Sequence, residues 1–245
     1  MFRIFQRSKN GPGDLFSRLG TDMHSHLLPG VDDGSPDLAT SLELIRGLAG
    51  LGYKRLVTTP HVLWEMYPNT REGILRKANE LRSAVEQEGI GVEIGVGAEY
   101  FLDAHVAGLL QRKEPLLTIG GNKVLCEFSL AFPSHDLKDI LFEMNMCGYQ
   151  PVIAHPERYI YLQHQKEFFD ELKHAGCLFQ LNILSLTGHY GKAVDELAHY
   201  LLRKGYYDLA GTDLHHARHL AGLQSFSDPA LAERVASGSL LNSLL

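Results

Sequence analysis

Residues 21–26, which read Thr-Asp-Met-His-Ser-His, contain the pattern from which the interpretation of this chain starts. Side chains two positions apart point to the same side of a β-strand, whereas they do not share a face of a helix. His24 and His26 are therefore predicted to project together from the end of a first strand. The pair Asp32-Asp33 follows shortly afterwards, and two imidazoles with a carboxylate are a typical beginning of a metal site.

Strand-like and helical segments alternate along the rest of the chain. Short apolar segments that favour strands lie at residues 21–26, 55–59, 92–98, 123–125, 151–154, 178–181 and 207–210. Segments with a helical spacing of apolar residues separate them. This alternation predicts right-handed β-α-β units with parallel strands, and about seven such units suit a closed or nearly closed barrel better than an open sheet. Segments 116–118 and 123–125, on either side of Gly120-Gly121-Asn122, are predicted to form a hairpin.

The chain is long enough for one barrel domain, which we place at residues 19–245 after a flexible tail at residues 1–18. The tail is predicted to end at residues 10–13, which read Asn-Gly-Pro-Gly. Its basic start could graze a membrane surface, although a frayed terminus is the simpler interpretation. The chain stops at Leu245 without an evident closing segment, so a truncation there is left open.

Composition argues against several classes of protein. The 245 residues carry a net charge of -6 and no basic stripe, which argues against nucleic acid as the main partner. Three widely spaced cysteines without a Cys-x-x-Cys pair indicate a reduced chain. No apolar run is long enough to cross a bilayer. We therefore expect a cytoplasmic protein that is not transmembrane, with a peripheral place at the inner face of the membrane as an alternative.

Ionisable residues fall at the carboxyl ends of the predicted strands, which is the edge where α/β barrels keep their chemistry. Burying so many ionisable groups without partners would be costly, and metal binding is one of the few arrangements that stabilises such a cluster. The set holds five histidines and four carboxylates, which is more than one ion needs, so a cluster of two or three divalent ions is predicted. The residues are His24, His26, Asp33, His61, Glu99, Glu127, His155, Asp213 and His215.

Some of these assignments stay open from the sequence. Asp32 could be the ligand in place of Asp33, which we favour, and the other aspartate would then serve the following turn or cap the next helix. Glu99 could be a surface charge, but it directly follows an apolar strand, which favours a ligand. Two further histidines, His216 and His219, neighbour the predicted site without an assigned role.

Two arginines are candidates for binding a phosphate group. Arg158 lies three residues after His155, and Arg218 lies five residues after Asp213. The planar guanidinium group can donate two parallel hydrogen bonds to a phosphate. An ordinary surface ion pair is the alternative for each arginine, and it is a stronger alternative for Arg218 than for Arg158.

Taken together, these motifs resemble those of the polymerase and histidinol phosphatase (PHP) superfamily. More narrowly, they resemble its bacterial protein-tyrosine phosphatases of capsule and exopolysaccharide clusters, the CpsB/YwqE type. The resemblance rests on His-x-His, Asp-Asp-Gly, a lone histidine after the second strand, two separated glutamates, His-Pro-Glu-Arg-Tyr and Asp-x-His, and it covers residues 21–220.

The resemblance implies a distorted (β/α)7 TIM-like barrel of the PHP fold. It also implies a trinuclear centre that usually depends on manganese, although iron, zinc and cobalt suit the same donors. By motif, the nine residues named above would bind these ions, and Arg158 and Arg218 would hold the phosphate.

The implied reaction is hydrolysis of phosphotyrosine on the tyrosine-rich tail of a membrane-bound autokinase that controls polysaccharide export. The Cys-x5-Arg loop of other tyrosine phosphatases is missing, because Phe132, Ile153 and Ile183 stand where its arginine would be. No covalent cysteine intermediate is therefore expected. The alternatives are a small-molecule phosphatase, such as histidinol-phosphate phosphatase, and an inactive metal-binding regulatory module.

Overall fold

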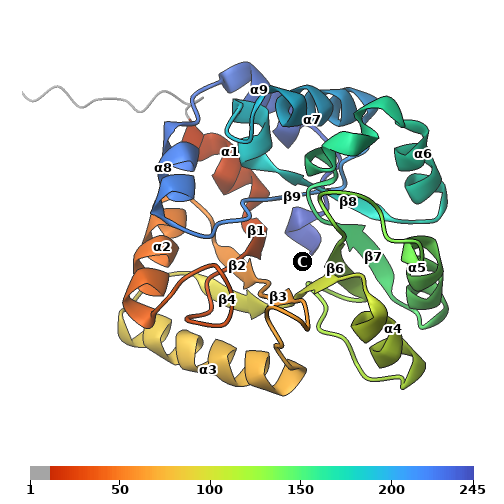
Figure 1. The fold of residues 1–245 in the computed structure, drawn as a ribbon. Coiled ribbons are helices and arrows are strands. Elements are labelled where there is room, and N and C mark those ends of the chain that lie inside the picture. Colours follow the sequence, from red (N-terminus) through yellow and green to blue (C-terminus); the bar gives the residue numbers. More distant parts are fainter. Residues whose placement is uncertain (1–11) are drawn as a thin grey trace, which may run out of the picture.

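Parallel β-strands form the centre of the structure, and helices surround them on the outside (Figure 1). The computed structural model describes residues 12–245. Each strand pairing in this range is parallel, which confirms the predicted α/β class with a parallel sheet. The strands are β1 (Thr21–Ser25), β2 (Arg55–Thr58), β3 (His61–Val62), β4 (Glu93–Val96), β5 (Glu99–Phe101), β6 (Lys123–Glu127), β7 (Gln150–Ile153), β8 (Leu178–Asn182) and β9 (Leu209–Gly211).

Two short interruptions divide the strands into a group ordered β1-β2-β4 and a group ordered β3-β5-β6-β7-β8-β9. Residues 59–60 separate β2 from β3, and residues 97–98 separate β4 from β5. Backbone hydrogen bonds span these interruptions, for example from Glu99 N to Pro60 O at 3.0 Å. The two groups of strands therefore continue into each other.

The first strand lies beside the chain that follows the last strand. Ser25 forms a parallel bridge with Leu214. His26 N donates to Leu214 O at 2.9 Å, and Asp213 N donates to His24 O at 2.8 Å. The strands are thus arranged around a common centre, as Figure 1 shows.

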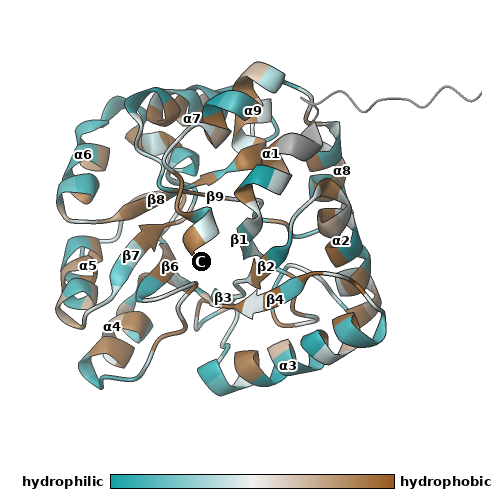
Figure 2. Cartoon of the chain, turned by 180° about the vertical axis from the view of Figure 1, so that it is seen from behind, coloured by the Kyte–Doolittle hydropathy of each residue, from teal (hydrophilic) through white to brown (hydrophobic). Residues whose placement is uncertain are grey.

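The helices cover the outer side of the strands and show one apolar and one polar face (Figure 2). Side chains of Asp37, Thr70, Asp103 and Asp228 accept backbone N–H groups at the starts of four of them. In residues 12–245 no helix has both the length and the apolar character that crossing a membrane requires. The helices are α1 (Pro12–Leu19), α2 (Leu38–Leu51), α3 (Arg71–Gln87), α4 (Ala104–Gln111), α5 (Leu137–Met146), α6 (Glu167–His174), α7 (Lys192–Lys204), α8 (Ala217–Ser225) and α9 (Pro229–Ala236).

Two apolar clusters stabilise this arrangement. The larger cluster packs helices against strands, with residues such as Leu44, Leu81 and Leu201. The smaller cluster joins side chains of β1, β2, β6, β7 and β9, among them Leu125, and the chain end packs against it through Leu245. Figure 1 accordingly shows the C-terminus at the centre of the strands. Leu125 and Glu127 lie two positions apart on β6 and share a face, so the polar site lies next to this inner cluster.

The prediction of a flexible tail at residues 1–18 is wrong for residues 12–18, which are helical, while residues 1–11 lie outside the described part. Helix α1 begins at Pro12, and its side chains Leu15, Phe16 and Leu19 are buried. The ring of Phe16 lies 5.4 Å from that of Tyr53. Glycine and proline in this sequence favour a turn, but proline is also well suited to the first position of a helix, where Pro12 stands. The apolar spacing of the helix then lets it pack against the core.

The predicted hairpin around Gly120 is present only as a turn. Ile119 N donates to Lys123 O at 2.9 Å, and Lys123 begins β6, whose strand neighbours are parallel. Residues 116–118 form no strand. Leu116 N and Leu117 N instead donate to the hydroxyl groups of two tyrosines, so side chains take the place of a partner strand.

We expect the substitution Phe16→Ala to lower the free energy of unfolding by about 3–5 kcal/mol, because it removes a fully buried ring that packs against the core. Urea denaturation of the full chain measures the change. Leu244→Ala is the control, since Leu244 is 74% exposed and its truncation should cost less than about 0.5 kcal/mol. Equal stability of Phe16→Ala and the unchanged protein would show that α1 contributes nothing to the core.

Candidate metal centre

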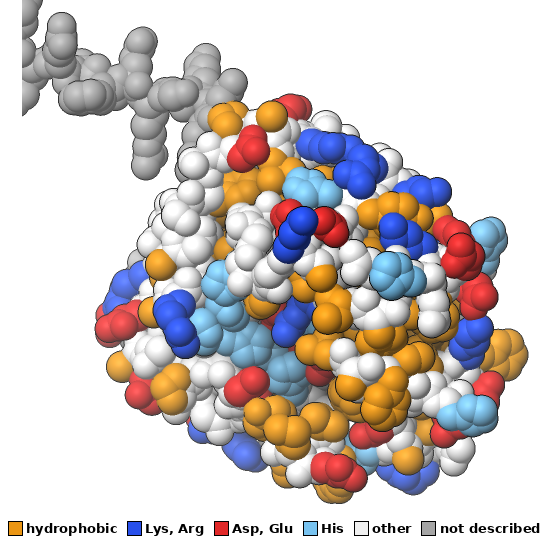
Figure 3. Space-filling model, turned by 45° about the horizontal axis from the view of Figure 1, so that its top comes forward, with side chains coloured by type: hydrophobic (Ala, Val, Ile, Leu, Met, Phe, Trp, Pro, Cys, Tyr) orange, Lys and Arg blue, Asp and Glu red, His pale blue; other side chains and the backbone are white. Residues whose placement is uncertain are grey.

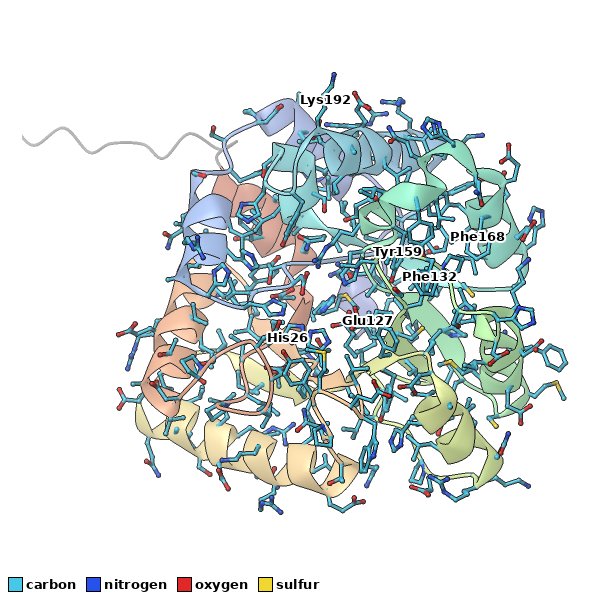
Figure 4. All side chains as sticks on the ribbon, viewed as in Figure 1. His26, Glu127, Phe132, Tyr159, Phe168 and Lys192 are labelled. Carbon is cyan, nitrogen blue, oxygen red and sulfur yellow. The ribbon has the colours of Figure 1, made fainter. Side chains whose placement is uncertain are left out.

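The predicted ligands meet at the carboxyl ends of the strands. Within residues 12–245, three groups of side chains bring ligand atoms within 4.8 Å of one another. The ninth predicted ligand, His155, joins them through Glu99, whose Oε1 lies 3.2 Å from its Nε2 atom. Figure 4 labels His26 and Glu127, which lie near the centre of the strands. The three groups are His24, His26 and Asp213; His26, Asp33, His61 and His215; and His61, Glu99 and Glu127.

Glu99 lies in the middle of the cluster and is fully buried. Its carboxylate oxygens lie 3.1 Å from His24, 3.4 Å from His26, 3.2 Å from His61 and 3.2 Å from His155. A buried carboxylate without positive charge nearby is strongly disfavoured. Burial raises the pKa of Glu99, but the charges of His24 and His61 outweigh this effect and hold the pKa well below its usual value. Glu99 is therefore an anion around which the imidazoles gather.

The hydrogen bonds of His24 and His26 fix which ring nitrogen of each faces the cluster. Nδ1 of His24 lies 2.9 Å from Oε1 of Gln180, and Nδ1 of His26 lies 2.8 Å from Oδ2 of Asp32. Both oxygens can only accept, so both Nδ1 atoms carry hydrogen. The two Nε2 atoms lie 3.2 Å apart, and in neutral rings their lone pairs would face each other. A shared cation removes this repulsion, so the residues fit divalent metal ions.

The two neighbouring aspartates have different places. Asp32 Oδ2 accepts from the ring of His26 and from His61 N at 3.1 Å, so Asp32 orients a predicted ligand. Asp33 Oδ1 lies 3.5 Å from Nε2 of His61 and 3.6 Å from Nε2 of His215. The structure thus brings Asp33 into the cluster and leaves Asp32 behind His26. The role of Asp33 as a ligand stays a prediction that this geometry favours.

Strand β8 supplies no predicted ligand but holds two amides that sequence reasoning missed. Gln180 and Asn182 lie two positions apart and share one face of the strand. Gln180 Oε1 accepts from His24 and also from His155 N at 3.1 Å. Asn182 Nδ2 donates to Asp213 Oδ2 at 3.0 Å. The signal available in the sequence is a pair of amide residues that alternate with apolar residues in the segment 178–182.

Arg158 lies beside the cluster, as predicted. It ends the short 3-10 helix η1 (Pro156–Arg158), and its Nη1 donates to Asp213 Oδ2 at 2.9 Å. The guanidinium carbon lies 4.9 Å from the centre of the Tyr190 ring, a cation–π arrangement. Asp213 and Tyr190 therefore hold a planar cation in place at the edge of the site. Its role in binding phosphate stays a prediction.

Arg218 has a different environment. It is exposed in the first turn of α8 and does not line the cavity over the cluster. His216 caps this helix, and His219 is the residue of the first turn that is buried toward the site. The helix therefore directs His219 inward and leaves Arg218 in solvent. This placement does not support the predicted contact of Arg218 with phosphate, which remains untested.

Two cluster residues have a positive backbone φ angle, which residues other than glycine rarely adopt. His155 has a φ of 33° and Asp213 a φ of 50°, and Lys113 is the one other non-glycine residue of this kind in residues 12–245. Such conformations cost about 1–3 kcal/mol each and tend to persist at functional sites. His155 lies two residues after the end of β7 and Asp213 two residues after the end of β9, where the turn directs each side chain toward the cluster.

A cavity of about 340 Å³ opens over the cluster. Its walls include six of the nine predicted ligands together with Arg158, Tyr190, Leu130, His216 and His219. Figure 3 shows histidines gathered in a hollow of the surface beside basic side chains. A cavity of about 430 Å³ next to Trp64 contains none of the nine. The site therefore offers nitrogen and oxygen donors for metal ions and a cation for an anionic substrate.

We expect metal binding to release protons. Burial and the charge of His26 lower the pKa of His61, but Glu99 and Glu127 outweigh them and raise it to about 9. A metal ion binds the neutral imidazole, so below this pH it must displace a proton, and affinity should rise with pH up to about 9. Calorimetry of Mn²⁺ binding in buffers of different ionisation enthalpy measures the release. Metal affinity that stays constant from neutral pH upward would contradict the assignment of His61.

We expect Gln180→Ala to weaken Mn²⁺ binding by about 10–100-fold, because the rings of metal-binding histidines depend on the partner of their second nitrogen. Competition with a chelator measures the affinity. The control is Gln150→Ala, since Gln150 begins β7, at the end of the strand away from His155, and donates to Gly176 O. Unchanged affinity of the Gln180→Ala protein would show that this amide does not orient His24.

Comparison with known proteins agrees with these observations. The tyrosine-protein phosphatase YwqE of Bacillus subtilis is 27% identical over 198 residues, covering 80% of this chain and 78% of the relative. The tyrosine-protein phosphatase CpsB of Streptococcus agalactiae is 30% identical over 200 residues, covering 79% of this chain and 82% of the relative.

A solved structure extends the likeness to the fold. It is one of the crystal structures of YwqE from Bacillus subtilis and CpsB from Streptococcus pneumoniae, which are described as unique metal-dependent tyrosine phosphatases. It matches with a TM-score of 0.76 and 25% identity, covering 91% of this chain and 94% of the other. A family profile described as "Capsular polysaccharide synthesis, CpsB/CapC" matches residues 20–223. The chain is therefore a member of the CpsB/CapC family.

Proposed function

We propose that this chain is a metal-dependent phosphatase that hydrolyses phosphotyrosine in proteins. The observation that carries the proposal is the buried Glu99 carboxylate among four imidazoles, with Arg158 at the wall of the cavity above it. The names of the relatives support the reaction, and the fit of the donors supports the metal dependence.

We further propose that the fold is a distorted (β/α)7 barrel of the PHP type. In support, β2 with β3 and β4 with β5 each occupy one position in the ring, which gives seven positions with the other five strands. The bridge between Ser25 and Leu214 joins the first position to the last.

Two or three divalent ions, with manganese as the first choice, would occupy the centre. The three groups of donors each mix imidazole and carboxylate, a set that manganese, iron, zinc and cobalt all accept. The residues that would hold the ions are His24, His26, Asp33, His61, Glu99, Glu127, His155, Asp213 and His215.

The bound ions would polarise the phosphoryl group and lower the pKa of water at the centre. Arg158, which donates to Asp213 beside the cluster, would also donate to the phosphate oxygens, where negative charge grows during the reaction. The phenolate of tyrosine, with a pKa of about 10, leaves readily, so the mechanism needs no strong general acid.

A cysteine nucleophile plays no part in this proposal. Burial raises the pKa of Cys126 well above its usual value and that of Cys177 to about 12. Cys147 is exposed. None of the three lines the cavity over the cluster.

The natural substrate that we propose is the phosphorylated tail of a membrane-bound tyrosine autokinase of capsule or exopolysaccharide synthesis. The chain would act on it in the cytoplasm, at the inner face of the membrane. The capsular family and the names of the relatives support this partner.

We expect the purified protein to hydrolyse a phosphotyrosyl peptide, to lose this activity with a chelator and to regain it with Mn²⁺. His155→Ala should reduce both bound metal and turnover, turnover by more than about 100-fold, because it removes a ligand of the centre. His174→Ala, on the exposed end of α6, is the control. Iodoacetamide should leave the activity intact.

Several outcomes would contradict the proposal. Activity that survives chelation would exclude a metal mechanism, and loss of activity on alkylation would point to a cysteine. Faster turnover of histidinol phosphate than of the peptide would favour the small-molecule phosphatase. Metal binding without turnover of either substrate would favour the inactive module.

A further inference from the structure

We propose that three exposed apolar side chains beside the cavity form a docking surface for the residues that flank phosphotyrosine in a polypeptide substrate. This surface, which we name the apolar rim, consists of Leu130, Phe132 and Ile160. The inference rests on the proposed phosphatase function and concerns how the same site distinguishes a protein segment from a small phosphate ester.

The three side chains of the rim are exposed to solvent. Leu130 is 44% exposed, Phe132 68% and Ile160 48%. Leu130 and Phe132 lie in the loop after β6, and Ile160 lies just after η1. Figure 3 shows a broad hydrophobic area beside the histidines of the hollow, and the view of Figure 4 shows Phe132 in the same region of the picture as Glu127 and Tyr159. Apolar patches of this kind commonly mark interaction sites.

The two loops of the rim are joined to each other. Tyr161 Oη donates to Ser129 O at 3.0 Å, and Phe128 N donates to Tyr159 Oη at 3.2 Å. The rings of Phe128 and Tyr159 stack with their centres 3.8 Å apart. The rim is therefore built on a fixed base, which lowers the entropy that binding would cost.

Leu130 connects the rim with the site, because it is part of the cavity wall together with Glu127 and Arg158. The polar residues of the cavity suit the phosphate, and the side chain of Leu130 in its wall suits contact with the ring of tyrosine. The main chain of a bound phosphotyrosine must then leave the cavity past its edge. Residues on either side of it would reach the rim, whereas a small phosphate ester has nothing that extends so far.

The chemistry of the loop favours a polypeptide over a membrane. Residues 129–134 read Ser-Leu-Ala-Phe-Pro-Ser and carry no ionisable side chain. Segments that bind anionic membranes usually combine apolar residues with lysine and arginine. The rim therefore fits apolar or aromatic side chains in the substrate segment.

The test compares three substrates on the metal-loaded full chain: a phosphotyrosyl peptide with leucine and phenylalanine on both sides, a matched peptide with serine and glycine there, and p-nitrophenyl phosphate. The variants are Phe132→Ser, Ile160→Ser and both together. Phe142→Ser is the matched control, since Phe142 is 64% exposed but lies on α5 and does not line the cavity.

We expect the double variant to raise KM for the apolar peptide by about tenfold with kcat unchanged, because uniform binding is lost. The polar peptide and p-nitrophenyl phosphate should be turned over as before, and Phe142→Ser should behave as the unchanged protein. Identical kinetics of the double variant and the unchanged protein on all three substrates would overturn the inference. If the unchanged protein hydrolyses none of them, the proposed function itself fails.

Two further measurements decide between the proposed occupant and others. Vesicle sedimentation tests a membrane surface, and light scattering after gel filtration tests a second copy of the chain. If the double variant loses vesicle binding or self-association while KM for the apolar peptide stays constant, the rim serves that other partner and the inference is wrong.

Discussion

The whole site depends on one buried negative charge. Glu99 is fully buried, and its carboxylate is stable there because four imidazoles surround it within 3.4 Å. Those imidazoles come from β1 and the residue after it, from β3 and from the turn after β7, so the charge is balanced only when distant parts of the chain have come together. The strand ends are therefore held in place by electrostatics as well as by the apolar core below them.

Supporting residues turn this collection of charges into a defined arrangement. Asp32 and Gln180 hold the outer nitrogens of His26 and His24, and both inner nitrogens then face the same point. Without these two acceptors, the rings could rotate or exchange tautomers. Asn182 does the same for one oxygen of Asp213. The ligands alone do not specify the geometry, because the partners behind them set their direction.

The structure brings the predicted ligands close together because they lie at or near the ends of short apolar strands, and parallel strands end at one edge. His155 and Asp213 follow β7 and β9 after one intervening residue, whereas Glu99 is the first residue of β5, and the role of each as a ligand stays a prediction. The role of Gln180 depends on which residue lies across the ring of strands, which no local pattern reveals. The prediction of a tail at residues 12–18 was wrong for a related reason. Glycine and proline there suggest a turn, and only contact with the core stabilises helix α1.

Asp213 connects the two functions of the site. Its Oδ1 lies 3.3 Å from His24, within the cluster, while its Oδ2 accepts from Arg158 and Asn182. The same carboxylate therefore faces the proposed metal ions on one side and the proposed phosphate-binding cation on the other. Any shift of Asp213 within the cluster would move Arg158 as well, because a hydrogen bond of 2.9 Å joins them. Its positive φ makes this position depend on the surrounding contacts, so the cluster and the arginine are arranged together.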